Sequence, residues 1–343
     1  MGWEDRVAQL VRWLKIDSTS GQEGAYLEVL ERDLEAEGFQ VERLEVPGEP
    51  FDKRWNLLAT TGSDPEVVLS THVDTVPPFL PVELRDGGAI YARGACDTKG
   101  VLMAMVEAAA RLRAADPALA KRVGILLVIG EETDHCGAAA AASLPLRPKR
   151  IILGEPTRCQ VALGQKGILK ARVLATGKAG HSAFLDAGHS AIDKLLDVLW
   201  RVRQAQWPQD PDLGPTTINV GMIRGGVAAN IFAPEASADL MFRAVSDTQG
   251  LEAQLRQLAG EQAQVQVLSR GEPQHFDRPP RDEETCVVPF NSDAAWLRPL
   301  GPVWLTGPGD IRLAHSDHEH ITVADLEAGA QLYQRLIRAA LEG

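Results

Sequence analysis

The chain contains 343 residues, of which 45% are apolar and 24% charged, and its formal net charge is −12. These values are typical of an ordinary globular protein with about two domains. The acidic balance argues against a nucleic-acid or anionic-membrane partner, because both attract basic surfaces. The four cysteines lack C-x-x-C spacing, and the N-terminus lacks the basic region and cleavage site of a signal peptide. We therefore expect a cytoplasmic protein with reduced thiols and no membrane-spanning segment.

The first half of the chain alternates predicted helices and strands. Helical periodicity marks residues 3–15, 20–39 and 100–114, and an alanine-rich helix is expected before residue 150. Strands are expected over 39–46, 56–61, 67–70, 90–92, 123–130 and 150–153. The segment 123–130 shows no polar alternation, as expected for a central strand buried on both faces. This order predicts an α/β domain with a central, mostly parallel sheet and helices on both faces.

From Gly167 onward the pattern changes to strand, helix, strand, strand, helix, strand. The six segments are 168–176, 190–206, 216–224, 232–245, 251–262 and 265–269. This β-α-β-β-α-β order is that of a split ferredoxin-like unit. A stretch rich in proline and charge, 270–285, is expected to lead the chain out of that unit. We therefore expect residues 1–166 and 271–343 to form one domain and residues 167–270 to form an inserted second domain.

Acidic and histidine residues come directly after several predicted strands. His72, the pair Glu131–Glu132 and Glu155 occupy such positions, and open α/β sheets bind ligands at this edge. Asp97 and His315 stand in similarly polar motifs. Carboxylates and imidazoles are the usual ligands of zinc, cobalt and manganese. Five ligands and a spare carboxylate suffice for two metals with one shared bridge and a general base, so a hydrolase is the leading hypothesis.

A set of motifs in a fixed order carries a family resemblance. The segments THVDTVP, RGACDTKG, GEET, GEPT, KAGHSA, IRGGVAANI, GPG and AHSDHE follow one another between residues 70 and 320. Together they resemble the metallohydrolase family of acetylornithine deacetylase, succinyl-diaminopimelate desuccinylase and carboxypeptidase G. The resemblance implies a catalytic domain with a two-metal site, interrupted by a lid domain that usually also forms a homodimer.

The resemblance assigns metal ligands residue by residue. His72 and Glu155 would hold one divalent ion, and Glu132 and His315 the other. Asp97 would bridge the two ions, with a water or hydroxide as the second bridge. Zinc is the expected metal, with cobalt and manganese as alternatives.

The resemblance also implies catalytic and substrate-binding residues. Glu131 would be the general base, which takes a proton from the bridging water so that hydroxide attacks the acyl carbon, and then protonates the leaving amine. Asp74 would accept the N–H of the metal-binding imidazole two residues before it and fix the tautomer. His181, Asn230 and Arg243 resemble substrate-binding residues of the lid, where an Arg fork suits a carboxylate.

The chain departs from the family pattern in places. The residues Asp134–Cys136 follow GEET where small residues are common, and we expect the histidine among them to be ordinary. AHSDHEH offers three histidines for one ligand role. We take His315 because Glu319 then falls at the family's recurring acid; His318 or His320 is the alternative.

The resemblance implies a homodimer that hydrolyses an N-acyl amino acid, in the first instance N-acetyl, to the free amino acid and a carboxylate, and we expect it in the cytoplasm. One alternative is a dipeptidase or carboxypeptidase. Another is a hydrolase that releases lysine or ornithine from an amino-group carrier protein, although a net charge of −12 opposes docking of an acidic carrier unless a local basic patch exists. A catalytically inactive binding protein is a third class, and the complete ligand set argues against it.

Overall fold

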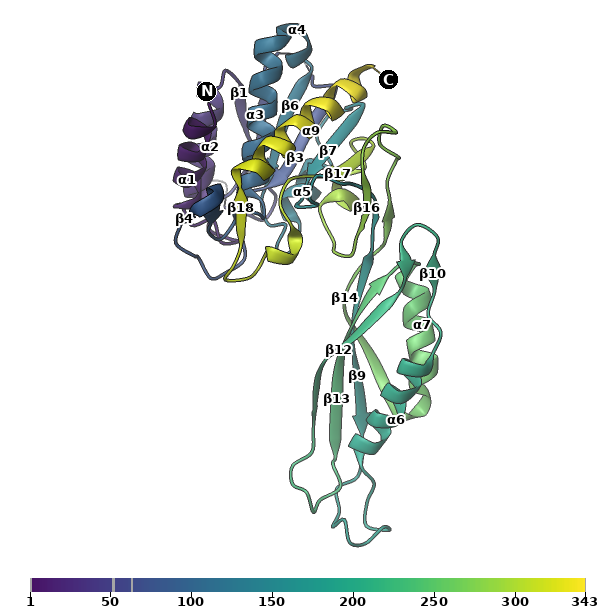
Figure 1. Cartoon of the computed structure of the whole chain (residues 1–343). Coiled ribbons are helices and arrows are strands. Elements are labelled where there is room, and N and C mark those ends of the chain that lie inside the picture. Colours follow the sequence, from purple (N-terminus) through teal and green to yellow (C-terminus); the bar gives the residue numbers. More distant parts are fainter. Residues whose placement is uncertain (1, 51–52, 63, 343) are drawn as a thin grey trace. The chain divides into compact units, whose positions relative to one another are not determined.

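The computed structural model describes residues 2–50, 53–62 and 64–342. The chain divides into two compact units (Figure 1). Unit 1 contains Met1–Leu163, Phe276–Cys286 and Ser292–Gly343, and unit 2 contains Gly164–His275 and Val287–Asn291. In the described part of the chain, no helix is both long enough and apolar enough to cross a membrane.

A six-stranded mixed sheet forms the centre of unit 1. Its order is β1 (Gln40–Leu44), β2 (Asn56–Thr60), β6 (Val123–Val128), β3 (Val67–His72), β7 (Arg150–Gly154) and β17 (Val303–Thr306). The strands from β6 to β17 are parallel, whereas β1 pairs with β2, and β2 with β6, in antiparallel fashion. The sheet is therefore mixed but mostly parallel, as predicted, and β2 is the strand that runs opposite to the others. An antiparallel pair needs no crossover helix, and the described residues between β1 and β2 contain no helix.

Helices cover this sheet. They are α1 (Trp3–Leu14), α2 (Gly24–Ala36), α3 (Lys99–Ala115), α4 (Pro117–Ala120), α5 (Cys136–Ala141), α8 (Ala294–Leu297) and α9 (Val323–Glu342). Every residue of β3 and β6 is buried, which requires cover on both faces of the sheet. Helices α3 and α9 pack against each other, and both contact β3. Residues such as Met103 and Leu336 place these helices in the main apolar core.

A second, small sheet brings two distant loops together. It consists of β4 (Glu83–Arg85), β5 (Ala89–Tyr91) and β18 (His320–Thr322), and Tyr91 pairs with His320 across it. The loop that leaves β5 therefore lies beside the loop that enters β18. A short 3-10 helix, Ile311–Leu313, precedes the second loop.

Unit 2 contains a four-stranded antiparallel sheet and two helices. In chain order these are β9 (Gly167–Thr176), α6 (Ala191–Gln204), β12 (Thr217–Gly225), β13 (Glu235–Ala244), α7 (Thr248–Ala259) and β14 (Ala263–Gly271). The strand order is β12-β13-β9-β14. Alternate residues of β9, from Leu169 to Ala175, are buried with apolar residues of α6 and α7. The remaining strands of the described chain are β8 (Val161–Gln165), β10 (Gln209–Asp210), β11 (Gly214–Pro215), β15 (Gln274–His275) and β16 (Thr285–Val288). Of these, β8 and β16 have residues in both units.

Candidate metal centre

The central sheet delivers three polar segments to one edge. His72 is the last residue of β3, Glu155 follows β7, and Glu131–Glu132 lie just beyond β6. Because β3 is parallel to both neighbours, the carboxyl ends of all three strands share that edge. Asp97 lies in the loop after β5, and His315 lies in the loop before β18. The small sheet thus brings together the two residues that do not follow strands of the central sheet.

The first group of potential metal ligands is His72, Asp97 and Glu155. All three residues are buried, and each offers one ligand atom within 4.8 Å of the others. The Nε2 atom of His72 lies 3.1 Å from Oδ1 of Asp97. Glu155 Oε1 is buried and has no hydrogen-bond partner among the described residues. A buried carboxylate oxygen needs a partner, and a divalent cation would supply one.

The second group is Asp97, Glu132 and His315, whose ligand atoms also lie within 4.8 Å of one another. His315 Nε2 lies 2.9 Å from Glu132 Oε1 and 3.4 Å from Asp97 Oδ2. Asp97 therefore belongs to both groups and directs a different oxygen toward each. This is the arrangement that a carboxylate bridging two cations requires.

The other two histidines of the AHSDHEH segment are arranged differently. The ring of His320 stacks on Tyr91 with their centroids 4.4 Å apart. Its Nδ1 atom lies 2.8 Å from the carbonyl oxygen of His318. His315 is the histidine of this segment whose ring nitrogen faces both Asp97 and Glu132.

The acidic residues of the site affect one another's protonation. Burial raises the pKa of Glu131 and Glu155 well above the ordinary value, and neighbouring carboxylates add to the effect. Burial alone would also raise the pKa of Asp97, but hydrogen bonds with His315 and His72 lower it. Hydrogen bonds to Asp97 and Glu132 raise the pKa of His315 to about 10. Without metal the cluster thus retains protons that divalent cations would displace, so the donor set fits metal ions of the zinc kind.

The Asp74 carboxylate contacts the main chain of the Glu131–Glu132 segment. It accepts the backbone N–H of Glu131 at 3.0 Å and that of Glu132 at 3.1 Å, together with the Ser20 hydroxyl at 2.7 Å. His72 Nδ1 lies 2.9 Å from the carbonyl oxygen of Asp74 and 3.5 Å from its Oδ1. The shorter contact of the imidazole is therefore with the main chain of Asp74, and the carboxylate mainly orients the segment that carries the two glutamates.

A buried ion pair near Asp97 was missed by the sequence reasoning. Glu319 Oε1 accepts the backbone N–H groups of Cys96 and Asp97, both at 3.2 Å. Its Oε2 atom accepts a hydrogen bond from Arg93 Nη1 at 2.5 Å. The pair joins the loop after β5 to the loop that carries His315. Glu319 was singled out only as a recurring acid, because the sequence gives no sign of a partner 226 residues away.

The predicted substrate-binding residues lie in unit 2. His181 and Asn230 are exposed and lie in two loops. A hydrogen bond from the backbone N–H of Ser182 to the carbonyl oxygen of Asn230 connects these loops. Arg243 is half-buried on β13, opposite Thr217 and Ile168 of the neighbouring strands. Their roles remain predictions.

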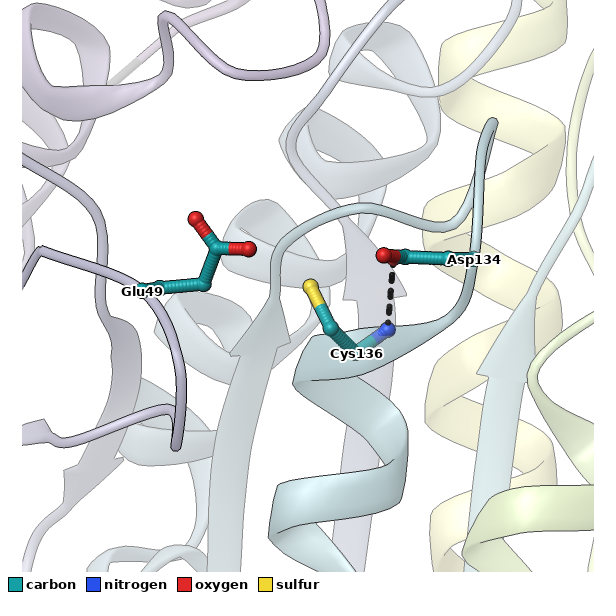
Figure 2. Close-up of side chains that lie close together, drawn as sticks. All are labelled: Glu49, Asp134 and Cys136. Carbon is teal, nitrogen blue, oxygen red and sulfur yellow. Dashed lines mark hydrogen bonds between the residues drawn. The ribbon is translucent and has the colours of Figure 1, made fainter.

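A further group of metal-type side chains lies apart from these potential ligands. Figure 2 shows Glu49, Asp134 and Cys136, where the Cys136 backbone N–H donates to Asp134 Oδ1 at 3.1 Å. Glu49 already forms a 2.5 Å ion pair with Arg54. Burial, with a contribution from Asp134, raises the pKa of the Cys136 thiol to about 12. A protonated thiol is a poor ligand, so we assign no ion to this group.

The sequence is similar to those of a known peptidase family. A model of peptidase family M20/M25/M40 matches residues 68–339. A peptidase M20 domain-containing protein of Schizosaccharomyces pombe is 34% identical over 329 residues, covering 94% of this chain and 82% of the relative. A probable carboxypeptidase of Aspergillus terreus is 33% identical over 368 residues, covering 96% of this chain and 84% of the relative.

Solved structures share the fold at lower identity. A tripeptidase of Staphylococcus aureus matches with a TM-score of 0.82 at 21% identity, and the match covers 100% of each chain. A dinuclear metal-binding M20 peptidase of Bacillus subtilis matches with a TM-score of 0.72 at 15% identity, covering 99% of this chain and 98% of that one. The chain belongs to peptidase family M20/M25/M40 and is a metallohydrolase that acts on amide bonds.

Proposed function

We propose that this protein uses two divalent metal ions to hydrolyse the amide bond of an N-acyl amino acid. The observation that carries the proposal is the sharing of Asp97 between two adjacent groups of ligands, with Glu131 beside them. The first substrate candidate is an N-acetyl amino acid, because the GEPT and KAGHS motifs resemble the deacetylase and desuccinylase branch of the family.

A small peptide is the second substrate candidate. Relatives and structural neighbours are named as a probable carboxypeptidase and a tripeptidase. A dipeptide is chemically also an N-acyl amino acid, since its peptide nitrogen belongs to an amino acid with a free carboxylate. Both candidates therefore require the same chemistry at the metal centre and differ in the acyl group.

In the proposed site the ligands are divided between the two ions. His72 and Glu155 would hold one ion, Glu132 and His315 would hold the other, and Asp97 would contribute to both. When bound, the ions act as Lewis acids that polarise the amide carbonyl and lower the pKa of a water molecule. Zinc suits this mixture of imidazole and carboxylate ligands, and cobalt and manganese are the alternatives.

Glu131 is the proposed general base. Its backbone N–H is held by Asp74, which orients the segment that carries its side chain. Burial raises its pKa well above the ordinary value for a carboxylate. This raised pKa belongs to the metal-free site. With both ions bound, a carboxylate at this position can accept a proton from the attacking water and deliver it to the leaving nitrogen.

Unit 2 is the proposed lid and dimerisation domain, with the strand order of a ferredoxin-like unit. Arg243 is proposed to bind the substrate carboxylate through bidentate hydrogen bonds, with His181 and Asn230 as further substrate contacts. The support for a homodimer is that β12 is an edge strand and that unit 2 exposes large apolar side chains. Ile223 on β12 is 59% exposed, and Trp200 on α6 is 65% exposed.

A substrate panel tests this proposal. Primary-amine release is measured from N-acetyl amino acids, N-succinyl amino acids and dipeptides, with zinc- or cobalt-loaded protein and with a chelator-treated control. We expect chelator-sensitive release from one class, and loss of release in Glu131→Gln with both metals retained. A protein that binds two metals per chain but hydrolyses none of these amides would contradict the proposed substrates.

A further inference from the structure

A histidine and a buried aspartate lie beside Glu131. His135 Nδ1 is 2.8 Å from Asp293 Oδ1 and 3.9 Å from Glu131 Oε1. The three residues each offer a polar atom within 4.8 Å of the others, and all of them belong to unit 1. None of the roles described so far uses His135 or Asp293.

The charge of Asp293 determines which atom carries the hydrogen in its bond to His135. When Asp293 is ionised, Nδ1 of His135 carries the hydrogen of their bond, because an ionised carboxylate only accepts hydrogen bonds. Because the same Nδ1 lies 3.9 Å from Glu131 Oε1, its N–H dipole attracts that carboxylate as well. His135 Nδ1 thus forms a hydrogen bond with Asp293 and lies within electrostatic range of Glu131.

The Asp293 side chain is buried, so its hydrogen bond with His135 is important for its stability. Its side chain is 1% exposed, and its Oδ2 atom has no hydrogen-bond partner among the described residues. A buried carboxylate is costly unless it is paired, so the bond to His135 partly offsets that cost. The pairing also restricts the imidazole to one orientation.

The backbone at His135 does not by itself favour histidine. Its φ is 59°, in the left-handed region, where it precedes helix α5. Glycine adopts this conformation without steric cost, and asparagine does so more readily than most residues. A histidine here is therefore better explained by its side chain than by the turn.

We propose that His135, held by Asp293, is a positioning residue that keeps the Glu131 carboxylate oriented for proton transfer. The inference rests on the proposed function, in which Glu131 is the general base. A general base must be held within a fraction of an ångström of its working position, and a neighbouring donor fixed by a buried acid provides that restraint.

The backbone conformation provides a matched pair of variants. His135→Gly removes the donor and suits the left-handed backbone, whereas His135→Asn suits the same backbone and places an amide N–H near the position of Nδ1. We expect kcat to fall about 10- to 100-fold in His135→Gly and in Asp293→Asn, with KM and the two-metal content unchanged. His135→Asn should recover most of the lost kcat. His275→Gln, in unit 2, is the control for a histidine without this role and should match the wild type.

A readout independent of turnover accompanies the kinetics. The proton NMR spectrum of the wild type should contain a slowly exchanging imidazole N–H signal that both His135→Gly and Asp293→Asn lose. Wild-type kcat in His135→Gly, together with inactive Glu131→Gln, would overturn this inference and leave the proposed function intact. A third bound metal that is lost in His135→Gly would also overturn it, because the group would then be a ligand set. Absence of hydrolysis by the wild type across the substrate panel would instead refute the proposed function, and this inference with it.

Discussion

Glu319→Gln should strongly destabilise the metal-free protein, because it leaves the charge of Arg93 buried without its partner. Arg93 and Glu319 are 2% and 1% exposed, and their side chains are 2.5 Å apart. Removing one partner of such a buried pair costs about 3–5 kcal/mol of unfolding free energy. Glutamine still offers an oxygen to the N–H groups of Cys96 and Asp97, although a neutral acceptor is weaker. We therefore expect a loss of about 3–5 kcal/mol.

Urea unfolding in the presence of chelator measures this loss without a contribution from bound metal. The double variant Arg93→Met/Glu319→Gln removes both charges and should be more stable than Glu319→Gln alone. Glu83→Gln is the matched control, since Glu83 forms an exposed pair with Arg85 at 2.7 Å, and it should unfold like the wild type. A loss below about 1 kcal/mol in Glu319→Gln, or additive losses in the double variant, would refute the reasoning.

Three further predictions concern the site and the thiols. Glu131→Gln should lower kcat about 10²- to 10⁴-fold while both metals stay bound, as steady-state kinetics and metal analysis would show; unchanged kcat would exclude Glu131 as the base. Because the pKa of His315 is raised to about 10 without metal, zinc binding at pH 7.5 should release protons, and affinity should rise with pH up to about that value. Calorimetry in buffers of different ionisation enthalpy measures this release, and its absence would contradict the protonated imidazole. The same shift stabilises the metal-free fold fully below the ordinary histidine pKa, and the stabilisation is lost as pH rises through about 10. Burial raises the pKa of Cys136 and Cys159 to about 12 and that of Cys286 to about 11, so these thiols should react slowly with a disulfide reagent at pH 8 and rapidly after unfolding.

The parts of the fold that could be predicted from the sequence are those whose own residues show a clear pattern, such as an apolar run between turn residues. The strands β3, β6 and β7 are apolar runs between turn residues, and their parallel pairing places His72 and Glu155 at one edge. Segment type alone therefore predicted where two of the proposed ligands lie. The pairing of β1 and β2 was not predictable in the same way, because a strand's own residues do not determine the direction of its neighbour.

What the sequence reasoning missed depends on contacts between distant residues. Strands β5 and β18 are three residues long and become recognisable only through their pairing, which brings the Asp97 and His315 loops together. Asp293 resembles any loop aspartate until burial and the bond to His135 are known. A short motif encodes the type of ligand, whereas the residues that hold it in place are scattered along the chain.

The most direct test of the account is the anomalous scattering of a crystal of the zinc-loaded protein, collected on both sides of the zinc absorption edge. We expect two zinc peaks per chain, separated by about 3.5–4 Å, with a different Asp97 oxygen about 2.0–2.2 Å from each ion. His72 and Glu155 should ligate one ion, and Glu132 and His315 the other. A single peak, or two peaks without Asp97 between them, would contradict the two-metal site.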